Sequence, residues 1–484
     1  MEFPFEIWQL ILSHFDASSL KNALMWSKSF RELIVKSPNL MGKFPVIFNG
    51  RNWEESTKFI EQNGRHVRSI KILCEIENLR KVGNLLKKTP NIVMFVCDNT
   101  IEQSIEEHED IGDENIPVNL KNLRTLKIKS RFKTVKKLLE IFKAATCLKN
   151  FMISLVLYEP LVCLANFLMH QNHLESLRIF GVSGSDVTHL DSIFTNKFME
   201  TCKFKLRTLI VDCNLFYKEN FYRFLIDQSE NLKEFTMEAY NMDFKYFRVM
   251  LNNFNNLEKL SFSVKTLLND RRVDEIRNLR LPSVRDLELT GFCEDVSVHV
   301  SLAEIFPNLK SLNMHVAYFS IHNIVQKLPK LKKLTSECVK MEMLLLAESV
   351  SIVELNLFNI HSTLDSIYWV KLAENFPNLE RFVIKNIDMG NLVGALNKDV
   401  KNILGNLKLF QNLTYFEMSN TERGWIAVND DADLTEPEND DTNSKFRLIL
   451  KNSELRITNY FKTVQAEAIE KLVSELGIIK VFEI

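Results

Sequence analysis

The sequence predicts an α/β fold in which a long strand–helix solenoid follows a short helical segment. Three observations predict it. After residue 65, one short apolar motif returns again and again at intervals of a few tens of residues. Between the motifs, apolar residues recur with the spacing of an amphipathic helix. The first forty residues show the helical spacing without the motif, so we interpret them as a separate segment.

Length and composition are those of an ordinary globular protein. The chain has 484 residues, of which 46% are hydrophobic and 25% charged, and its formal net charge is -1. Nucleic-acid and membrane-surface binders need a concentrated basic excess, so we expect neither kind of partner. No apolar run is long enough to span a bilayer, and residues 1–20 lack the pattern of a secretory signal. We therefore expect a protein of the cytoplasm, the nucleus or both.

The residues that usually carry catalysis or bind metals are scattered. None of the eight cysteines forms a CxxC pair or a His/Cys cluster with zinc spacing, so we interpret them as free thiols in a reducing compartment. His170 and His173 form an isolated HxxH without further ligands, which is typical of a polar helix end. A P-loop, HExxH and GxSxG are all missing. We expect no metal, no cofactor and no enzymatic activity.

Fourteen motifs of the form L-x-x-L-x-L, with other large apolar residues allowed, follow one another along the chain. They begin at Val67, Ile92, Leu123, Leu148, Leu174, Leu206, Leu232, Leu257, Val284, Leu309, Leu331, Ile352, Leu379 and Leu413. Successive starts lie 21 to 34 residues apart, and most of these intervals are near the period of roughly 20–29 residues that is typical of leucine-rich repeats.

Each motif with the stretch that follows it predicts one strand and one helix. The second half of the motif alternates apolar and variable residues, as a strand buried on one face does. Two of the helical stripes are Val135, Leu138, Leu139 and Phe142, and Phe244, Phe247, Leu251 and Phe254. Such a unit cannot bury its own apolar face, so neighbouring units stack around one core. Over residues 66–484 we expect a horseshoe with a parallel concave sheet and convex helices.

The repeats depart from the standard pattern in two ways. The eighth position after the first apolar residue, usually Asn or Cys, is kept only at Asn214, and apolar packing replaces its hydrogen bonds elsewhere. Acidic stretches at 101–119 and 429–445 are interpreted as solvated loop insertions. A phosphorylation or basic-partner role for them is the alternative. Residues 466–484 predict a helix and a strand that close the array.

The first forty residues contain more large apolar side chains than so short a segment can bury by itself. Pro4 favours a helix start, and Ile7 and Ile11 follow with helical spacing. Asp16 is expected to be the N-cap of a second helix. Residues 30–34 carry a third apolar set. The surplus apolar surface must meet either the rest of the chain or another protein.

This segment resembles an F-box over residues 3–46. The resemblance lies in Phe3-Pro4-x-Glu6-Ile7, Ile11-Leu12-Ser13, Asp16-x-x-x-Leu20, Ser27-Lys28-x-Phe30-Arg31-x-Leu33 and Ser37-Pro38-x-Leu40. Phe3 stands where the family prefers Leu, and Trp26 to Arg31 stand where it prefers Val-Cys-Lys-x-Trp-Arg. Placed before leucine-rich repeats, the segment makes the chain similar to the F-box/leucine-rich-repeat family, and its irregular repeats resemble those of insect members.

The resemblance implies a substrate-recognition subunit of an SCF-type cullin–RING ubiquitin ligase. In that family the F-box docks on a Skp-family adaptor, the adaptor links it to cullin and RING subunits, and the repeats hold the protein substrate. It implies an F-box at 1–46, a connecting segment at 47–65 and the array at 66–484. Carried over by position, the adaptor-binding residues are Phe3, Pro4, Ile7, Ile11, Phe15, Leu20 and Trp26.

Two alternatives assign the apolar N-terminal residues to the chain itself. In the first alternative, residues such as Ile11, Leu24 and Leu33 pack only among the three helices. In the second, the chain is a non-catalytic leucine-rich-repeat scaffold or inhibitor whose helices cap the solenoid. Capping predicts that Phe3, Ile7 and Ile11 face the first repeat at Val67 and Ile70.

The variable strand residues are expected on the concave side, and their charge changes along the chain. It is basic near the start, acidic in the centre and mixed later. The early basic residues are Lys71, Lys127, Lys129 and Arg178, and the central acidic ones are Asp212, Glu234, Glu238, Asp286 and Glu288. We expect the acidic group to bind a basic surface of a protein substrate through charge complementarity. A solvated face without a dedicated ligand is the alternative.

Overall fold

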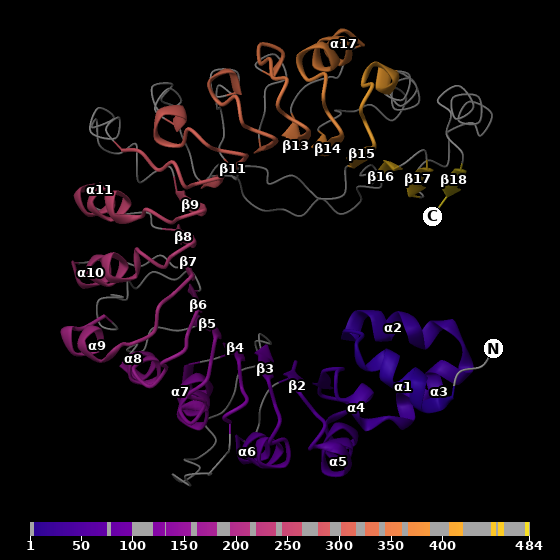
Figure 1. Ribbon diagram of the computed structural model, residues 1–484, viewed down its shortest axis with the longest axis vertical. Helices are drawn as coiled ribbons and strands as arrows, with labels where there is room; N and C mark the ends of the chain where they lie inside the picture. The colour runs from indigo at the N-terminus through magenta and orange to yellow at the C-terminus, as the bar shows by residue number, and fades with distance from the viewer. Residues whose placement is uncertain are drawn as a thin grey trace, which may run out of the picture. The chain divides into compact units, whose positions relative to one another are not determined.

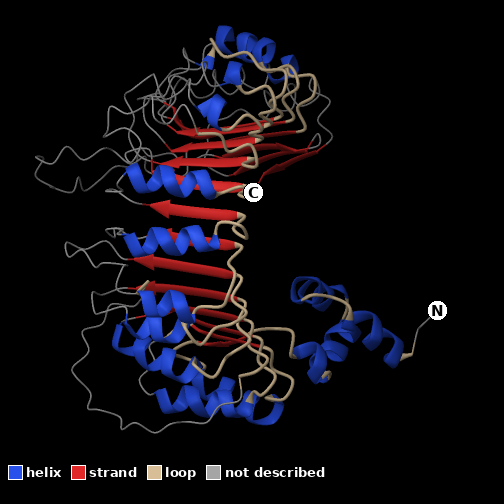
Figure 2. Cartoon of the chain, turned by 60° about the vertical axis from the view of Figure 1, so that its left-hand side comes forward, coloured by secondary structure: helices blue, strands red, loops and turns tan. Residues whose placement is uncertain are grey.

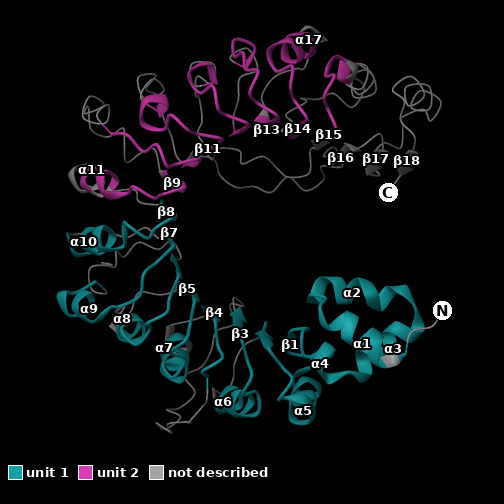
Figure 3. Cartoon of the chain, viewed as in Figure 1, with its two compact units in different colours: residues 1–246 teal, residues 247–484 magenta. Residues whose placement is uncertain are grey.

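The computed structural model describes most of the chain in separate stretches. These are residues 4–74, 79–98, 120–130, 132–155, 162–181, 194–212, 219–238, 244–263, 279–290, 302–315, 325–337, 344–360, 366–387, 406–419, 447–451, 454–458 and 480–483. They belong to two compact units, unit 1 at residues 1–246 and unit 2 at residues 247–484 (Figure 3).

Unit 1 begins with helices and continues as a strand–helix array (Figure 1). Its first helices are α1 (Phe5–Ser13), α2 (Ala17–Trp26), α3 (Lys28–Lys36) and α4 (Pro38–Met41). The array then contains β1 (Val46–Phe48), α5 (Trp53–Asn63), β2 (Ser69–Ile72), α6 (Leu79–Lys88), β3 (Met94–Asp98), β4 (Thr125–Ser130), α7 (Phe132–Phe142), β5 (Asn150–Leu155), α8 (Val162–Leu168), β6 (Ser176–Gly181), α9 (Asn196–Thr201), β7 (Thr208–Asp212), α10 (Glu219–Gln228) and β8 (Glu234–Glu238). Each of β1 to β8 pairs in parallel with the next.

Unit 2 continues the same construction, and α11 (Phe244–Asn253) leads into it. It contains β9 (Lys259–Ser263), β10 (Asp286–Thr290), β11 (Ser311–His315), β12 (Lys333–Glu337), β13 (Glu354–Ile360), α17 (Ser366–Asn375), β14 (Arg381–Ile387), η2 (Leu407–Leu409), β15 (Tyr415–Ser419), β16 (Arg447–Lys451), β17 (Glu454–Thr458) and β18 (Lys480–Glu483). Strands β9 to β15 are parallel neighbours. Strand β16 lies antiparallel to both β15 and β17, and β18 is parallel to β17.

The fourteen sequence motifs form the strands β2 to β15, which confirms the predicted α/β solenoid. Every strand begins two residues after the first apolar residue of its motif, from Ser69 after Val67 to Tyr415 after Leu413. In β4, Leu126 and Ile128 are buried, while Lys127 between them is exposed. This alternation follows from the pleat of a strand, which sends successive side chains to opposite faces.

Figure 2 shows helices on one side of the strands. Large apolar side chains are buried between these helices and the sheet. The predicted stripe of α7, from Val135 to Phe142, is buried. Phe142 contacts Phe95 of β3, with ring centroids 4.7 Å apart. The rings of Phe151 and Phe167 pair in the same way at 4.9 Å. Contacts of this kind account for part of the unusual content of 35 Phe residues.

The array starts earlier than the motifs indicate. Residues 47–65, expected to be a connecting segment, contain α5 and most of β1, and β1 pairs with β2. The register places Val46 beside Ile70 and Phe48 beside Ile72. Lys43 therefore stands where the other motifs have their first apolar residue, so this repeat does not match L-x-x-L-x-L. The antiparallel pairs of β16 were not expected either.

Several expectations fall outside the described residues. These are the acidic segments 101–119 and 429–445, Asn214, and the helix expected after residue 466. The strand expected at the end of the chain is β18.

Candidate functional site

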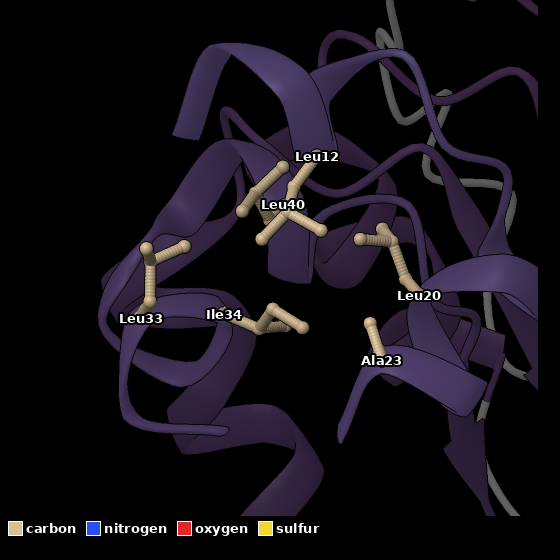
Figure 4. Packing of buried hydrophobic residues seen from close by; sticks show 6 residues of the cluster. All are labelled: Leu12, Leu20, Ala23, Leu33, Ile34 and Leu40. Carbon is tan, nitrogen blue, oxygen red and sulfur yellow. The ribbon is translucent and has the colours of Figure 1, made fainter. Parts of the chain in front are cut away.

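The N-terminal module, residues 4–44, has a small apolar core of its own. Its fully or almost fully buried side chains are Leu12, Leu20, Ala23, Leu33, Ile34 and Leu40, which converge from α1 to α4 (Figure 4). Trp8, Phe15 and Phe30 pack against this core from its edge. Because each large apolar side chain contributes roughly 1.5–3 kcal/mol on burial, these contacts hold the short helices together.

Side-chain caps fix where α2 and α3 begin. The backbone N–H of Ser19 donates to the carboxylate of Asp16 over 2.7 Å, as predicted for an N-cap. Hydrogen bonds from the backbone and side chain of Ser19 hold the pKa of Asp16 below its ordinary value. Ser27 plays the same part for α3, since its hydroxyl accepts from the N–H of Phe30 over 3.2 Å. The turns between the helices are thus set locally.

A junction formed by Asn39, Gly42, His66 and Arg68 joins the N-terminal module to the array. Asn39 Oδ1 and His66 Nδ1 are 2.8 Å apart, and the N–H of Arg68 donates to the carbonyl of Gly42 over 3.3 Å. A Cβ at Gly42 would lie only 2.0 Å from the carbonyl oxygen of His66, so only glycine permits this approach. Lys43 donates to the carbonyl of Phe15 over 2.6 Å and also to that of Ser13. The module therefore meets the array through α4 and Gly42, while Lys43 binds carbonyls within the module.

An apolar stripe on α1 remains uncovered, with Ile7 40%, Leu10 60% and Ile11 36% exposed. Their i, i+3, i+4 spacing places them on one side of the helix. Trp26 at the end of α2 is 57% exposed, and its ring contacts Phe15 with centroids 6.1 Å apart. We call the exposed apolar residues of α1 and of the end of α2, namely Ile7, Leu10, Ile11, Met25 and Trp26, the N-terminal apolar face.

The capping alternative requires Ile7 and Ile11 to cover Val67 and Ile70. In the structure Val67 and Ile70 are buried, while Ile7 and Ile11 stay exposed. The described contacts between the module and the array run through the junction instead. Leu33 of the other alternative does pack inside the module, and Leu24 is partly buried there.

The seven residues carried over from the F-box resemblance have different environments. Pro4, Ile7, Ile11 and Trp26 are exposed, and Phe15 is partly buried. The assignment of Leu20 to the adaptor-binding residues is corrected, because its side chain is 0% exposed in the module core and cannot face a partner. Phe3 lies outside the described residues. Leu10 and Met25, which the resemblance did not include, are also exposed; Leu10 continues the stripe of Ile7 at i+3, and Met25 precedes Trp26.

The acidic residues expected to bind a substrate are divided between the units. In unit 1, the register places Asp212 beside Glu238, and Glu234 accepts a hydrogen bond from Thr208 over 3.4 Å. In unit 2, Asp286 is exposed, and Glu288 lies 3.7 Å from His315. Each unit thus contributes its own part of the set.

The same sheet face in β12 to β14 carries ion pairs that join neighbouring strands. Lys333 and Arg381 flank Glu354 at 3.0 and 3.5 Å. Burial alone would raise the pKa of Glu354, but hydrogen bonds from Asn356 and Lys333 and the adjacent cations outweigh it, so the pKa is lowered. Opposite charges therefore compensate one another here.

The network of paired charges extends to β15, where it includes the aromatic ring of Tyr415. The guanidinium of Arg381 lies 3.8 Å from the ring centroid of Tyr415. The hydroxyl of Tyr415 donates to the carboxylate of Glu417 over 2.7 Å, and Lys385 lies 3.9 Å from the same carboxylate. Burial, together with this carboxylate, raises the pKa of Tyr415. The face predicted to be mixed in charge is internally paired.

The described residues contain no group of three or more His, Cys, Asp or Glu side chains that could hold a metal ion. His170 is bonded to the carbonyl of Asn166 over 2.7 Å just after α8, as expected for a polar helix end. An open hollow of about 410 Å³ is lined in part by Arg124, Lys149 and Glu175, but Lys149 and Glu175 pair with each other at 2.7 Å.

None of the helices in the described part of the chain is both long and apolar enough to cross a membrane.

The chain matches no protein-family profile and no curated protein sequence. Among solved structures it is similar to the crystal structure of the TLR13–ssRNA13 complex, with 14% identity and a TM-score of 0.35. The match covers 68% of this chain and 58% of that one, so the chain spans less than two thirds of its length. The repeated strand motifs and the parallel pairing of their strands, described above, are those of a leucine-rich-repeat solenoid.

Proposed function

We propose that the chain is the substrate-recognition subunit of an SCF-type ubiquitin ligase. The F-box at residues 1–46 would dock on a Skp-family adaptor, which brings the cullin and RING subunits, and the array at 66–484 would bind the protein substrate. The observation that carries the proposal is the N-terminal apolar face. It is exposed on a module that has its own core and meets the array through other residues.

The exposed apolar residues of this face would supply binding energy to a protein partner. Full burial of a large apolar side chain contributes roughly 1.5–3 kcal/mol. Ile7, Leu10 and Trp26 are already partly covered, so a partner would gain on the order of 1 kcal/mol from each. Exposed tryptophans are frequent hot spots of interfaces. A few such residues supply several kcal/mol, which favours docking over a purely structural role.

The proposal assigns no catalytic residue and no cofactor to this chain, because the ligase chemistry would belong to its partners. Cytoplasm and nucleus are the compartments in which we place it. The second candidate function is a non-catalytic scaffold or inhibitor. It keeps the array as the binding surface and leaves the N-terminal apolar face without a partner.

A binding experiment with a recombinant Skp-family adaptor separates the two functions. The test variant replaces Ile7, Leu10 and Trp26 with alanine in the full chain. The matched control replaces Leu346 and Val350, which are also exposed apolar residues but lie in unit 2. We expect the adaptor to co-purify with wild type and control and to be lost from the test variant, with thermal unfolding of all three unchanged. Absence of adaptor binding by the wild type, or its persistence in the test variant, would leave only the scaffold.

A further inference from the structure

One position of each strand from β2 to β7 forms a straight row across the sheet of unit 1. The register joins Lys71 to Val96, Val96 to Lys127, Lys127 to Met152, Met152 to Arg178 and Arg178 to Ile210. Cations and apolar residues therefore alternate from one strand to the next. We call Lys71, Val96, Lys127, Met152, Arg178 and Ile210 the basic row.

The cations of the basic row carry uncompensated charge. Lys127 and Arg178 are exposed and Lys71 is half-buried. Within the described part of the chain, none of the three forms an ion pair. Lys129, two residues beyond Lys127 on the same strand, differs because it lies 3.9 Å from Asp98. The apolar members Val96, Met152 and Ile210 are half-buried, so part of each is open to contact.

In unit 2, charged side chains on the corresponding face of the sheet form ion pairs with one another. There, Lys333 and Arg381 share Glu354, and Lys385 approaches Glu417. Paired charges already have their partner inside the molecule, so they offer little to an external charged ligand. The basic row lacks this compensation and attracts negative charge from outside.

The spacing of the row indicates the form of the ligand. Neighbouring strands are about 4.8 Å apart, so cations on every second strand repeat at about 9.6 Å. A polyproline II segment rises about 3.1 Å per residue with three residues per turn, so its every third side chain repeats at about 9.3 Å on one side. Acidic residues at every third position would therefore meet Lys71, Lys127 and Arg178 in turn.

We propose that the basic row binds an acidic, extended segment of a protein partner, with Asp or Glu at every third position and apolar side chains between them. The apolar side chains would contact Val96 and Met152. This deepens the proposed function, on which it rests for the role of the segment as part of the substrate. Single-stranded nucleic acids are a poorer match, because they use aromatic residues for base stacking and the row contains none.

Fluorescence anisotropy with a labelled peptide tests the proposal on the purified full chain. The probe is Glu-Leu-Pro repeated about four times, in which proline favours the polyproline II form. The test variant carries Lys71→Glu, Lys127→Glu and Arg178→Glu. The control carries Lys87→Glu, Lys136→Glu and Lys137→Glu, which change the net charge equally at exposed positions of α6 and α7. Thermal unfolding verifies that both variants are folded.

We expect the wild type and the control to bind the peptide alike and the test variant to lose at least about tenfold in affinity, since three attractive charge pairs become repulsive. Binding should weaken as salt is raised, because exposed charges are screened. The assay contains no adaptor, so its result is independent of the adaptor experiment.

Three outcomes overturn the proposal. Equal losses in both variants would show attraction by overall charge. Tighter binding of an oligothymidylate with the same charge would show a nucleic-acid surface. Binding only after deletion of residues 429–445 would show that an acidic segment of this chain is the occupant.

Discussion

Replacement of Gly42 by alanine should loosen the N-terminal module from the array. The new Cβ would lie 2.0 Å from the carbonyl oxygen of His66 and 2.8 Å from its carbonyl carbon. Both are backbone atoms, so no side-chain rotation can relieve the contact. An ordinary carbon–oxygen contact is about 3.5 Å. The two backbones must therefore separate by more than an ångström.

The loss of stability can be worked out from the strain at this contact and from the hydrogen bonds that the separation breaks. Overpacking in a rigid contact costs about 1–3 kcal/mol. The hydrogen bonds from Arg68 to Gly42 and between Asn39 and His66 lie at the same junction, and loss of each costs about 1 kcal/mol. We expect Gly42→Ala to destabilise the junction by about 3–5 kcal/mol, the sum of these contributions. The module core, which lies in α1 to α4, should remain folded.

Gly50 provides the matched control, because a Cβ there would meet nothing within 4 Å. Gly50→Ala should be neutral or stabilise by about 0.4–1 kcal/mol through the unfolded chain. Hydrogen exchange followed by mass spectrometry measures the effect locally. We expect faster exchange at residues 42–48 and 66–72 in Gly42→Ala alone. Identical exchange in the two variants would refute the inference that α4 packs directly on the first repeat.

Three further predictions concern the module core, acid stability and the thiols. Ile34→Ala should destabilise by about 2–5 kcal/mol and Val35→Ala by less than about 0.5 kcal/mol in thermal or denaturant unfolding, because Ile34 is 0% and Val35 57% exposed. The lowered pKa of Glu354 contributes stability above its unfolded pKa of about 4.3, and this is lost as pH falls through the lower folded value. The melting temperatures of wild type and Glu354→Gln should therefore differ more near neutral pH than in acid, and a constant difference would contradict the assigned ion pairs. Burial raises the pKa of Cys97 and of Cys202 to about 12, so iodoacetamide should label both slowly in the folded chain and quickly after denaturation, as mass spectrometry can show.

The repeats could be predicted from the sequence because residues close together in the chain determine each strand and its buried face. In the motif at Leu123, three apolar residues at fixed spacing determine the buried face of β4, and no distant contact is needed to interpret them. Strand β1 could not be predicted, because the role of Lys43 before it depends on a contact that is distant in the sequence. The side chain of Lys43 is turned toward the carbonyls at the end of α1, a contact that depends on the tertiary structure. The antiparallel β16 shows no motif that distinguishes its direction.

The N-terminal apolar face was only partly predictable. Helical spacing identifies α1 and α2 but does not state which side meets the module core. Leu20 and Trp26 both lie on α2, yet Leu20 is fully buried and Trp26 largely exposed. The difference arises from packing between the helices, which inserts Leu20 among Leu12, Ile34 and Leu40. The resemblance assigned both residues to the adaptor-binding set by their positions in the sequence. Only the packing shows that one of them is buried and the other exposed.

Both proposed surfaces lie in unit 1, and the junction between them determines how they are oriented. The N-terminal apolar face is fixed to α4 through the module core, and the basic row begins at β2, directly after His66 and Arg68. A close backbone contact at Gly42 is stiffer than a flexible linker. A bound substrate segment would thus be held at a defined position relative to the adaptor. If both proposals hold, Gly42→Ala should leave each binding affinity unchanged and slow only the transfer of ubiquitin to the substrate, because it alters their relative position and neither surface.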